Sequence, residues 1–165
     1  MELLEICGYS VPTDETNELL QDSIRLQIIG RINVGTKITI YRYQTPKQLS
    51  IPSIWVKQYG KDPNEFAFFK IVGDSLSGFG IFHNDLLMVD MTPTQIKQGS
   101  LCVAEYGEVG TVKYLWAEKG QFILHGLALP QGEQPPLLVI PKDSNAQIMP
   151  VIAQFRWHGD IPFQT

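Results

Sequence analysis

The feature that most constrains the fold of this chain is a series of short apolar runs separated by turn-forming residues. Val, Ile, Phe and Leu dominate the runs, whereas Gly, Pro and Asn fill the intervals. β-Branched and aromatic residues favour strands, and the intervals carry the chemistry of tight turns. Strands are expected over residues 24–30, 36–43, 66–73, 85–91, 100–106, 110–118, 121–127, 136–140 and 146–157. The sequence therefore predicts a mainly β, mostly antiparallel fold.

The first part of the chain differs from the rest. Residues 1–9 cluster apolar side chains as on one short helix, and the polar stretch that follows is broken by Pro. We therefore expect a helix remnant of a preceding domain and a linker over residues 1–23, and a single domain over residues 24–165. Between two of the strands, a short helix is expected near Ser53, which can cap it.

Composition excludes several classes of protein. The 165 residues carry a net charge of −4 and have a pI of about 5.3, so the chain lacks a basic footprint for nucleic acid. Any contact with DNA is expected from a separate N-terminal domain. Cys7 and Cys102 match no metal-binding spacing, and neither a metal nor a cofactor is expected. We read no secretion signal and no membrane anchor, and a reducing cytoplasm fits best.

The stretch Gly73-Asp74-Ser75 raises the question of a nucleophile, because it forms a small polar corner between two apolar runs. Such residues are also ordinary turn chemistry. A serine needs a base, and the usual one is histidine, yet each of the three histidines, His83, His125 and His158, reads more simply as a surface or strand-end residue. "GDSL" is also an esterase signature, but the chain has neither the late Asp-x-x-His nor the βαβ rhythm of those enzymes.

Lysine is the other base that can serve a serine, provided that its pKa is lowered by desolvation. Lys113 lies within the apolar run "GTVKYLW", where Thr111 and Leu115 share its face by the period-two alternation of a strand. A lysine on a half-exposed strand is the commoner explanation of such a position. The order of several motifs along the chain decides between the two.

The blocks "VGDSLSGFGIFHNDLLMVD" and "QGSLCVAEYGEVGTVKYL" resemble the core of the serine–lysine autopeptidases LexA, UmuD and the lambda-type phage repressors. Lys113 follows Ser75 by 38 positions (113 − 75), close to the usual spacing of that family. The resemblance covers residues 26–157 and implies a LexA-like peptidase domain built of small twisted antiparallel sheets. The matching residues are Gly73, Ser75, Gly80, Ile81, Asp85, Leu86, Val89, Gly99, Val103, Ala104, Thr111, Val112 and Lys113.

The resemblance implies a role for each site residue. Ser75 is the nucleophile, Lys113 the general base and acid, and the backbone N–H groups of Asp74 and Ser75 form the oxyanion hole. The segment 26–42 carries the bond to be cut, which is expected at Val34–Gly35.

Three positions depart from the family pattern. Leu76 replaces Met, and Asn84 replaces a Gly but tolerates the left-handed conformation. Val34 is stiffer than the usual Ala or Cys, so slow self-cleavage is an open alternative. Cys7–Gly8 is a second Cys-Gly pair but lies farther from Ser75 in the sequence.

The implied biology is that of a homodimeric, LexA-like or phage-like transcriptional repressor, which cuts itself in the SOS response to DNA damage when stimulated by RecA filaments. A UmuD-like subunit of a translesion polymerase is one alternative. A regulatory dimerisation module that cleaves poorly is another. Discovery of a helix-turn-helix upstream of Met1 in the native gene would favour the repressor.

Overall fold

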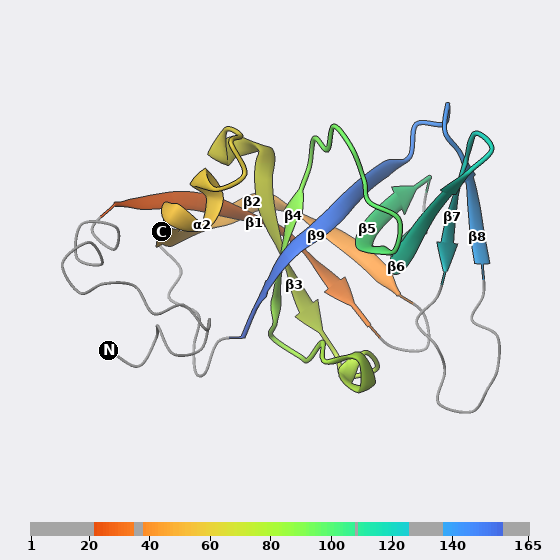
Figure 1. The fold of residues 1–165 in the computed structure, drawn as a ribbon. Helices are drawn as coiled ribbons and strands as arrows, with labels where there is room; N and C mark the ends of the chain where they lie inside the picture. Colours follow the sequence, from red (N-terminus) through yellow and green to blue (C-terminus); the bar gives the residue numbers. More distant parts are fainter. Residues whose placement is uncertain (1–21, 35–37, 108, 126–136, 157–165) are drawn as a thin grey trace.

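The computed structural model describes residues 22–34, 38–107, 109–125 and 137–156 (Figure 1). Its strands form one sheet in the order β2-β1-β3-β4-β9-β5-β6-β7-β8, which confirms the mainly β prediction. The strands are β1 (Ser23–Asn33), β2 (Thr39–Pro52), β3 (Phe66–Val72), β4 (Leu86–Asp90), β5 (Ser100–Tyr106), β6 (Val109–Glu118), β7 (Gln121–His125), β8 (Leu137–Pro141) and β9 (Gln147–Phe155). The short helices are α2 (Ile54–Lys57), η2 (Pro63–Glu65) and η3 (Ser77–Phe79).

Strand β9 joins the two parts of the sheet. It pairs with β4 over one stretch and with β5 over another, and in Figure 1 it crosses the middle of the molecule as the long blue strand. Among the described strands every pairing is antiparallel except that of β1 with β3, which is parallel. Because of this exception, the ends of β1 and β3 lie side by side.

An irregularity in β1 allows that strand to contribute to two hydrophobic cores. The pairing register shifts between Ile28 and Gly30, as at a β-bulge. Before the shift, Leu26 and Ile28 pack into one core, and after it Ile32 and Val34 pack into another. Gly30 is required at the shift, since a Cβ there would lie 2.3 Å from the Tyr41 carbonyl oxygen.

The second of these cores positions the site. We call it the Val34 cluster, and it draws residues from β1, β3, β4, β5, β6 and β9 and from the segment between β3 and β4. Its buried members are Ile29, Ile32, Val34, Ala67, Phe69, Ile71, Leu76, Ile81, Leu87, Val89, Val103, Val112 and Met149. The cluster therefore links the end of β1 to the middle of β6.

The helix predicted near Ser53 is present as α2, although Ser53 does not cap it with its side chain. Its hydroxyl instead donates to the Asp22 carboxylate at 2.9 Å, which ties the start of the sheet to the helix. The predicted helix over residues 1–9 and nearly all of the predicted linker lie outside the described residues.

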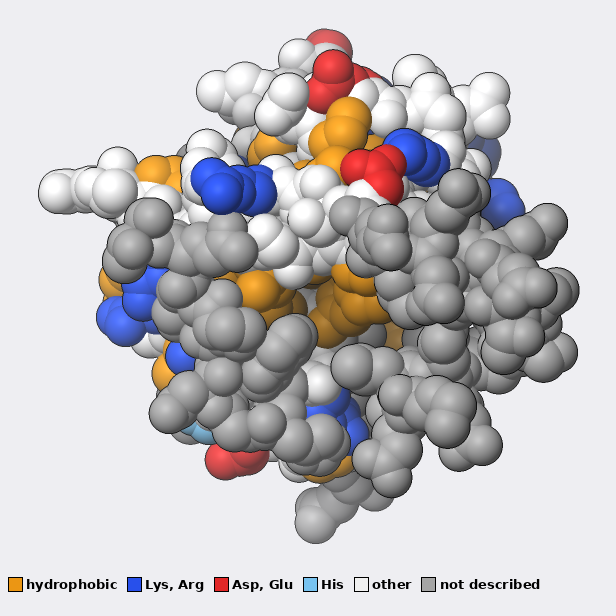
Figure 2. All heavy atoms as spheres, turned by 90° about the vertical axis from the view of Figure 1, so that its left-hand side faces the viewer, with side chains coloured by type: hydrophobic (Ala, Val, Ile, Leu, Met, Phe, Trp, Pro, Cys, Tyr) orange, Lys and Arg blue, Asp and Glu red, His pale blue; other side chains and the backbone are white. Residues whose placement is uncertain are grey.

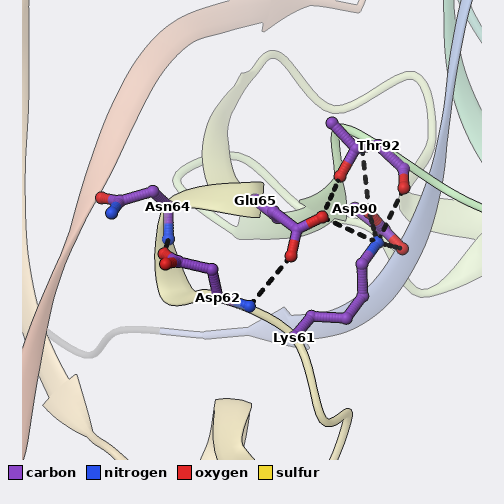
Figure 3. Close-up of polar contacts among 6 residues, drawn as sticks. All are labelled: Lys61, Asp62, Asn64, Glu65, Asp90 and Thr92. Atoms are coloured by element: carbon purple, nitrogen blue, oxygen red, sulfur yellow. Dashed lines mark hydrogen bonds and ion pairs between the residues drawn. The ribbon is translucent and has the colours of Figure 1, made fainter.

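Charged side chains close one end of the β3–β4 pair, which we call the Lys61 end (Figure 3). The Lys61 ammonium binds both carboxylate oxygens of Asp90, at 2.7 and 2.8 Å, and the Thr92 carbonyl at 2.8 Å. Glu65 accepts a hydrogen bond from the Thr92 hydroxyl at 2.6 Å and one from the Asp62 N–H at 2.9 Å. The network fixes the entry into β3 against the exit from β4.

Among the described side chains visible on the face drawn in Figure 2, both Lys or Arg and Asp or Glu side chains are present. Within the described ranges, no helix combines the length and the apolar character needed to cross a lipid bilayer.

Candidate active site

The predicted corner at Ser75 is present at the other end of the β3–β4 pair, which we call the Ser75 end. Strand β3 stops at Gly73, whose φ of 107° is a left-handed conformation that glycine tolerates best. The chain then turns into η3, with Leu76 buried beneath it and Ser75 exposed. Backbone bonds from Ser77 N–H to the Asp74 carbonyl (3.0 Å) and from Ile81 N–H to the Leu76 carbonyl (3.2 Å) close the turn. The backbone at Ser75 is held while its side chain faces outward.

A buried carboxylate binds groups of the loop that follows this turn. Asp85 is fully buried and accepts hydrogen bonds from the Phe82 N–H (2.8 Å), the Gln154 amide (2.7 Å) and the Arg156 guanidinium (3.0 and 3.1 Å). Gln154 and Arg156 also donate to the Gly80 carbonyl, at 2.7 and 3.1 Å. A buried charge is tolerated when it is paired and hydrogen-bonded in this way. The C-terminal end of β9 thereby fixes the loop that follows the turn.

The neighbouring position behaves as predicted from its chemistry. Asn84 adopts a φ of 70°, so Asn does take the left-handed conformation where the family pattern has Gly. Its N–H donates to the Ile71 carbonyl at 2.8 Å, which holds the loop to the end of β3.

The predicted cleavage segment lies against the turn. Val34 extends the parallel β1–β3 pairing by donating its N–H to the Val72 carbonyl at 2.8 Å. Its side chain is only 5% exposed and packs within the Val34 cluster. A Cβ on Gly73 would lie 2.2 Å from the Val34 carbonyl oxygen, so that carbonyl rests directly on the Gly73 backbone. Gly35, the other half of the predicted bond, lies outside the described residues.

Lys113 lies in the middle of β6, opposite Cys102 in the register with β5. Thr111 and Leu115, two positions to either side, are 5% and 0% exposed, and Val112 on the opposite face is also buried. Lys113 itself is half-buried, and desolvation lowers the pKa of its ammonium. The same apolar setting raises the pKa of the Cys102 thiol to about 12. Burial at this strand therefore favours the uncharged amine that a general base must be.

The chain neighbours of the two predicted catalytic residues share one core. Leu76 follows Ser75, Val112 precedes Lys113, and both belong to the Val34 cluster together with Val34 itself. The structure thus brings the turn and the cleavage segment into contact, and it packs Val112 of β6 into the same core. By the alternation of a strand, Lys113 lies on the opposite face of β6 from Val112, with Cys102 and Leu115 of another core.

Only some of the remaining candidate residues lie in the part of the chain that the structure describes. His83 contacts the turn, because its Nδ1 accepts the Gly73 N–H at 3.0 Å. His158, Cys7 and Gly8 lie outside the described residues, as does the side chain of His125. In the described part of the chain, no group of three or more His, Cys, Asp or Glu side chains could hold a metal ion.

Sequence reasoning missed the residues that hold the turn. Arg156 and Gln154 lie two positions apart at the end of β9, so the period-two alternation could have placed both on one face. Nothing local indicates that this face meets Asp85, 71 positions earlier. The bond from Gly73 to His83 likewise depends on how the loop folds back.

Comparison with known proteins gives a result consistent with this geometry. A search among curated proteins finds no match. The family model described as Peptidase S24-like matches residues 27–150, which includes Val34, the Ser75 turn and the Lys113 strand. The match spans well over half of the chain, and the chain belongs to the Peptidase S24-like family, the group of LexA-, UmuD- and phage-repressor-type serine peptidases.

Proposed function

We propose that this protein is a self-cleaving serine–lysine peptidase that cuts its own chain at Val34–Gly35. The observation that carries the proposal is the contact between the Val34 carbonyl oxygen and the backbone of Gly73, two residues before Ser75. A peptide held there lies beside the predicted nucleophile turn, and tethering in the same chain gives a high effective molarity. The family assignment supports the chemistry of a serine peptidase.

The β1–β3 ladder leads to the predicted oxyanion hole. Val34 N–H bonds to the Val72 carbonyl, and Asn33 is the register partner of Val72. In the evenly spaced pattern of a parallel ladder, the next donor along β3 is the N–H of Asp74, and its regular acceptor is the Val34 carbonyl. Gly73 leaves the extended conformation, so the ladder is not regular beyond it, and the Asp74 N–H is proposed as an oxyanion donor because it follows the residue that the Val34 carbonyl contacts.

The proposed reaction has two halves. Uncharged Lys113 takes the Ser75 Oγ proton, Oγ attacks the Val34 carbonyl carbon, and the oxyanion collapses as Lys113 returns the proton to the Gly35 nitrogen. This breaks the Val34–Gly35 bond and leaves an ester between Val34 and Ser75. Lys113 then takes a proton from water, the hydroxide attacks the ester, and Ser75 leaves with that proton, so the products are a Val34 carboxylic acid and a Gly35 amine.

The proposed role is that of a LexA-like or phage-like repressor domain in the cytoplasm, cut in response to DNA damage with RecA stimulation. The net charge of −4 agrees with DNA binding through a separate N-terminal domain, joined by residues 1–23, and with dimerisation as the task of residues 24–165. A UmuD-like subunit would use the same chemistry.

A second candidate function is a dimerisation module that retains the site but cleaves poorly. Val34 favours it, because the branch at Cβ is buried against the turn, with its Cγ2 3.4 Å from where a Gly73 Cβ would lie. A stiff, crowded side chain beside the carbonyl hinders the approach of the nucleophile.

Loss of the intact chain on incubation at about pH 10, where lysine is largely uncharged, tests the proposal. We expect cleavage in wild type and none in Ser75→Ala or Lys113→Ala. Ser77→Ala and Lys97→Ala, both exposed in the wild-type structure, are the matched controls and should cleave like wild type. An intact wild-type chain would favour the dimerisation module, and cleavage that persists in either dyad variant would remove the proposed mechanism.

A further inference from the structure

We propose that His83 is a positioning residue for self-cleavage: its unprotonated Nδ1 holds the Gly73 N–H, and protonating the imidazole slows the reaction. The inference rests on the proposed function. Its basis is the hydrogen bond from Gly73 N–H to His83 Nδ1, at 3.0 Å, between the end of β3 and the loop that precedes β4. His83 is exposed, so protons of the solvent reach the ring.

Gly73 is the residue through which such a bond can act on catalysis. It carries the Val34 carbonyl on one side and leads directly into Asp74 and Ser75 on the other. With a φ of 107°, it has left the extended conformation of β3. An anchor on its N–H therefore sets both the seat of the scissile carbonyl and the direction of the nucleophile turn.

The chemistry of imidazole makes this anchor sensitive to protons. A neutral imidazole has one nitrogen that donates and one that accepts, whereas an imidazolium donates from both. The Gly73 N–H can only donate, so its bond to Nδ1 requires the neutral ring. Protonation at Nδ1 replaces an attractive contact with two opposed N–H groups, and the turn loses its anchor.

The charged groups on the segments around His83 do not compete with the protonation of its own ring as the source of the pH effect. Asp74 is exposed in the turn, and Asp85 lies in the same loop as His83 but is bound by Arg156. Arg156, from the end of β9, is also stacked on the Phe82 ring at 4.1 Å from its centroid. Asp85 and Arg156 form an ion pair with each other, so we expect their charges to stay paired while the His83 ring is protonated.

The bond itself is tested by NMR on ¹⁵N-labelled Ser75→Ala protein, which does not consume itself during the measurement. Between about pH 8 and 5, where imidazoles titrate, the Gly73 amide signal should shift with the same midpoint as the His83 ring nitrogens. The Gly99 amide, bound to the Leu115 carbonyl at 2.7 Å, is the internal control and should not follow that midpoint. In His83→Asn on the same background, the Gly73 amide should no longer titrate.

The catalytic consequence is tested by self-cleavage rates from about pH 9 down to 5. Lys113 alone gives a rate that falls tenfold for each pH unit, and protonation of His83 should steepen the fall over the range of its titration by a further factor of about ten in all, as for one lost hydrogen bond. His83→Asn keeps an acceptor, Oδ1, at the position of Nδ1 but cannot titrate. It should cleave faster than His83→Ala at about pH 8 and show no steepening, while His83→Ala should be roughly tenfold slower than wild type, as for one lost hydrogen bond.

The outcomes separate the inference from the function on which it rests. A Gly73 amide that ignores the His83 titration overturns the inference whatever the cleavage rates. A Gly73 amide that follows it, with equal acid slopes in wild type and His83→Asn, shows a structural contact and also overturns the positioning role. Absence of cleavage in every variant removes the proposed function and the positioning role together, and the NMR titration then decides whether His83 holds the turn.

Discussion

At the Lys61 end of the β3–β4 pair, a lysine binds two acidic side chains and a carbonyl, and at the Ser75 end an arginine and a glutamine bind one buried carboxylate. The Lys61 network joins side chains to one another and also binds the Asp62 N–H and the Thr92 carbonyl at the rim of the sheet (Figure 3). The Asp85 network binds the Gly80 carbonyl and the Phe82 N–H, which are backbone groups of the loop that follows Ser75. Both ends are charged, yet their polar groups act on different parts of the chain.

The difference shows that charged side chains can hold the backbone of a catalytic turn in place without contacting the nucleophile. At the Lys61 end the ammonium has its donors occupied, so nothing is left to act on a substrate. At the Ser75 end the same kinds of side chain immobilise a corner and leave the serine exposed on it. Catalysis needs a fixed nucleophile more than it needs a dense charge cluster. Substitutions at the two ends should therefore differ in their effects on stability and on the rate of self-cleavage, with the largest effects at the Ser75 end.

Asp85→Ala should have the largest effect, because it removes the carboxylate that organises the Ser75 end. The substitution leaves the Phe82 N–H without its acceptor and removes the partner of the Gln154 amide and of the Arg156 guanidinium. We expect a loss of about 3 kcal/mol in the free energy of unfolding, measured by urea denaturation. Stability close to wild type would show that the Asp85 network does not hold this end together.

Gly73→Ala should follow, with its effect on the rate of self-cleavage. A Cβ at this position meets the Val34 carbonyl oxygen at 2.2 Å, and alanine is strained at a φ of 107°. A displacement of about 1 Å at a reacting group lowers a rate by roughly 100-fold. Cleavage at about pH 10, timed by gel densitometry, checks this, with Gly78→Ala as the matched control because no atom lies within 4 Å of its added Cβ and its φ is not left-handed. Equal rates in both variants would contradict the seat of the Val34 carbonyl.

The pH dependence of cleavage should report Lys113. Burial lowers the pKa of its ammonium, so the uncharged fraction rises with pH and reaches its limit below the value of about 10.4 for free lysine. The rate should rise about tenfold per pH unit near neutrality and become level before that value. A rate that still climbs tenfold per unit above about pH 10.5 would mean that Lys113 is solvated like an ordinary lysine.

Lys61→Met should have the smallest effect and should be confined to the other end. It removes the ion pair with Asp90 and the contact of the Lys61 ammonium with the Phe66 ring, and it keeps an unbranched apolar side chain at this position. The free energy of unfolding should fall by about 1 kcal/mol, while the rate of cleavage, corrected for the folded fraction, stays at the wild-type value. A slower reaction in the folded protein would show that the Lys61 end and the Ser75 end are coupled.

The sequence could indicate what is local in this molecule. The apolar run around Lys113 correctly indicated a strand, which is β6, and the chemistry of Asn84 correctly predicted its left-handed backbone. The roles of Ser75, Lys113, Asp74 and the Val34–Gly35 bond remain predictions drawn from resemblance and from the position of Val34.

Contacts between distant segments could not be predicted. The parallel pairing of β1 with β3 requires the chain to return past β2, α2 and η2, and no periodicity encodes that path. The Asp85–Arg156 pair and the bond from Gly73 to His83 depend on the same tertiary arrangement. These are the features that turn a strand end and a small turn into a site.

Intact mass spectrometry of the wild-type chain after alkaline incubation tests most directly whether folding seats the Val34 carbonyl where Ser75 can attack it. We expect two fragments, one ending at Val34 and the other beginning at Gly35. Fragments divided at Cys7–Gly8, or at any other bond, would contradict it.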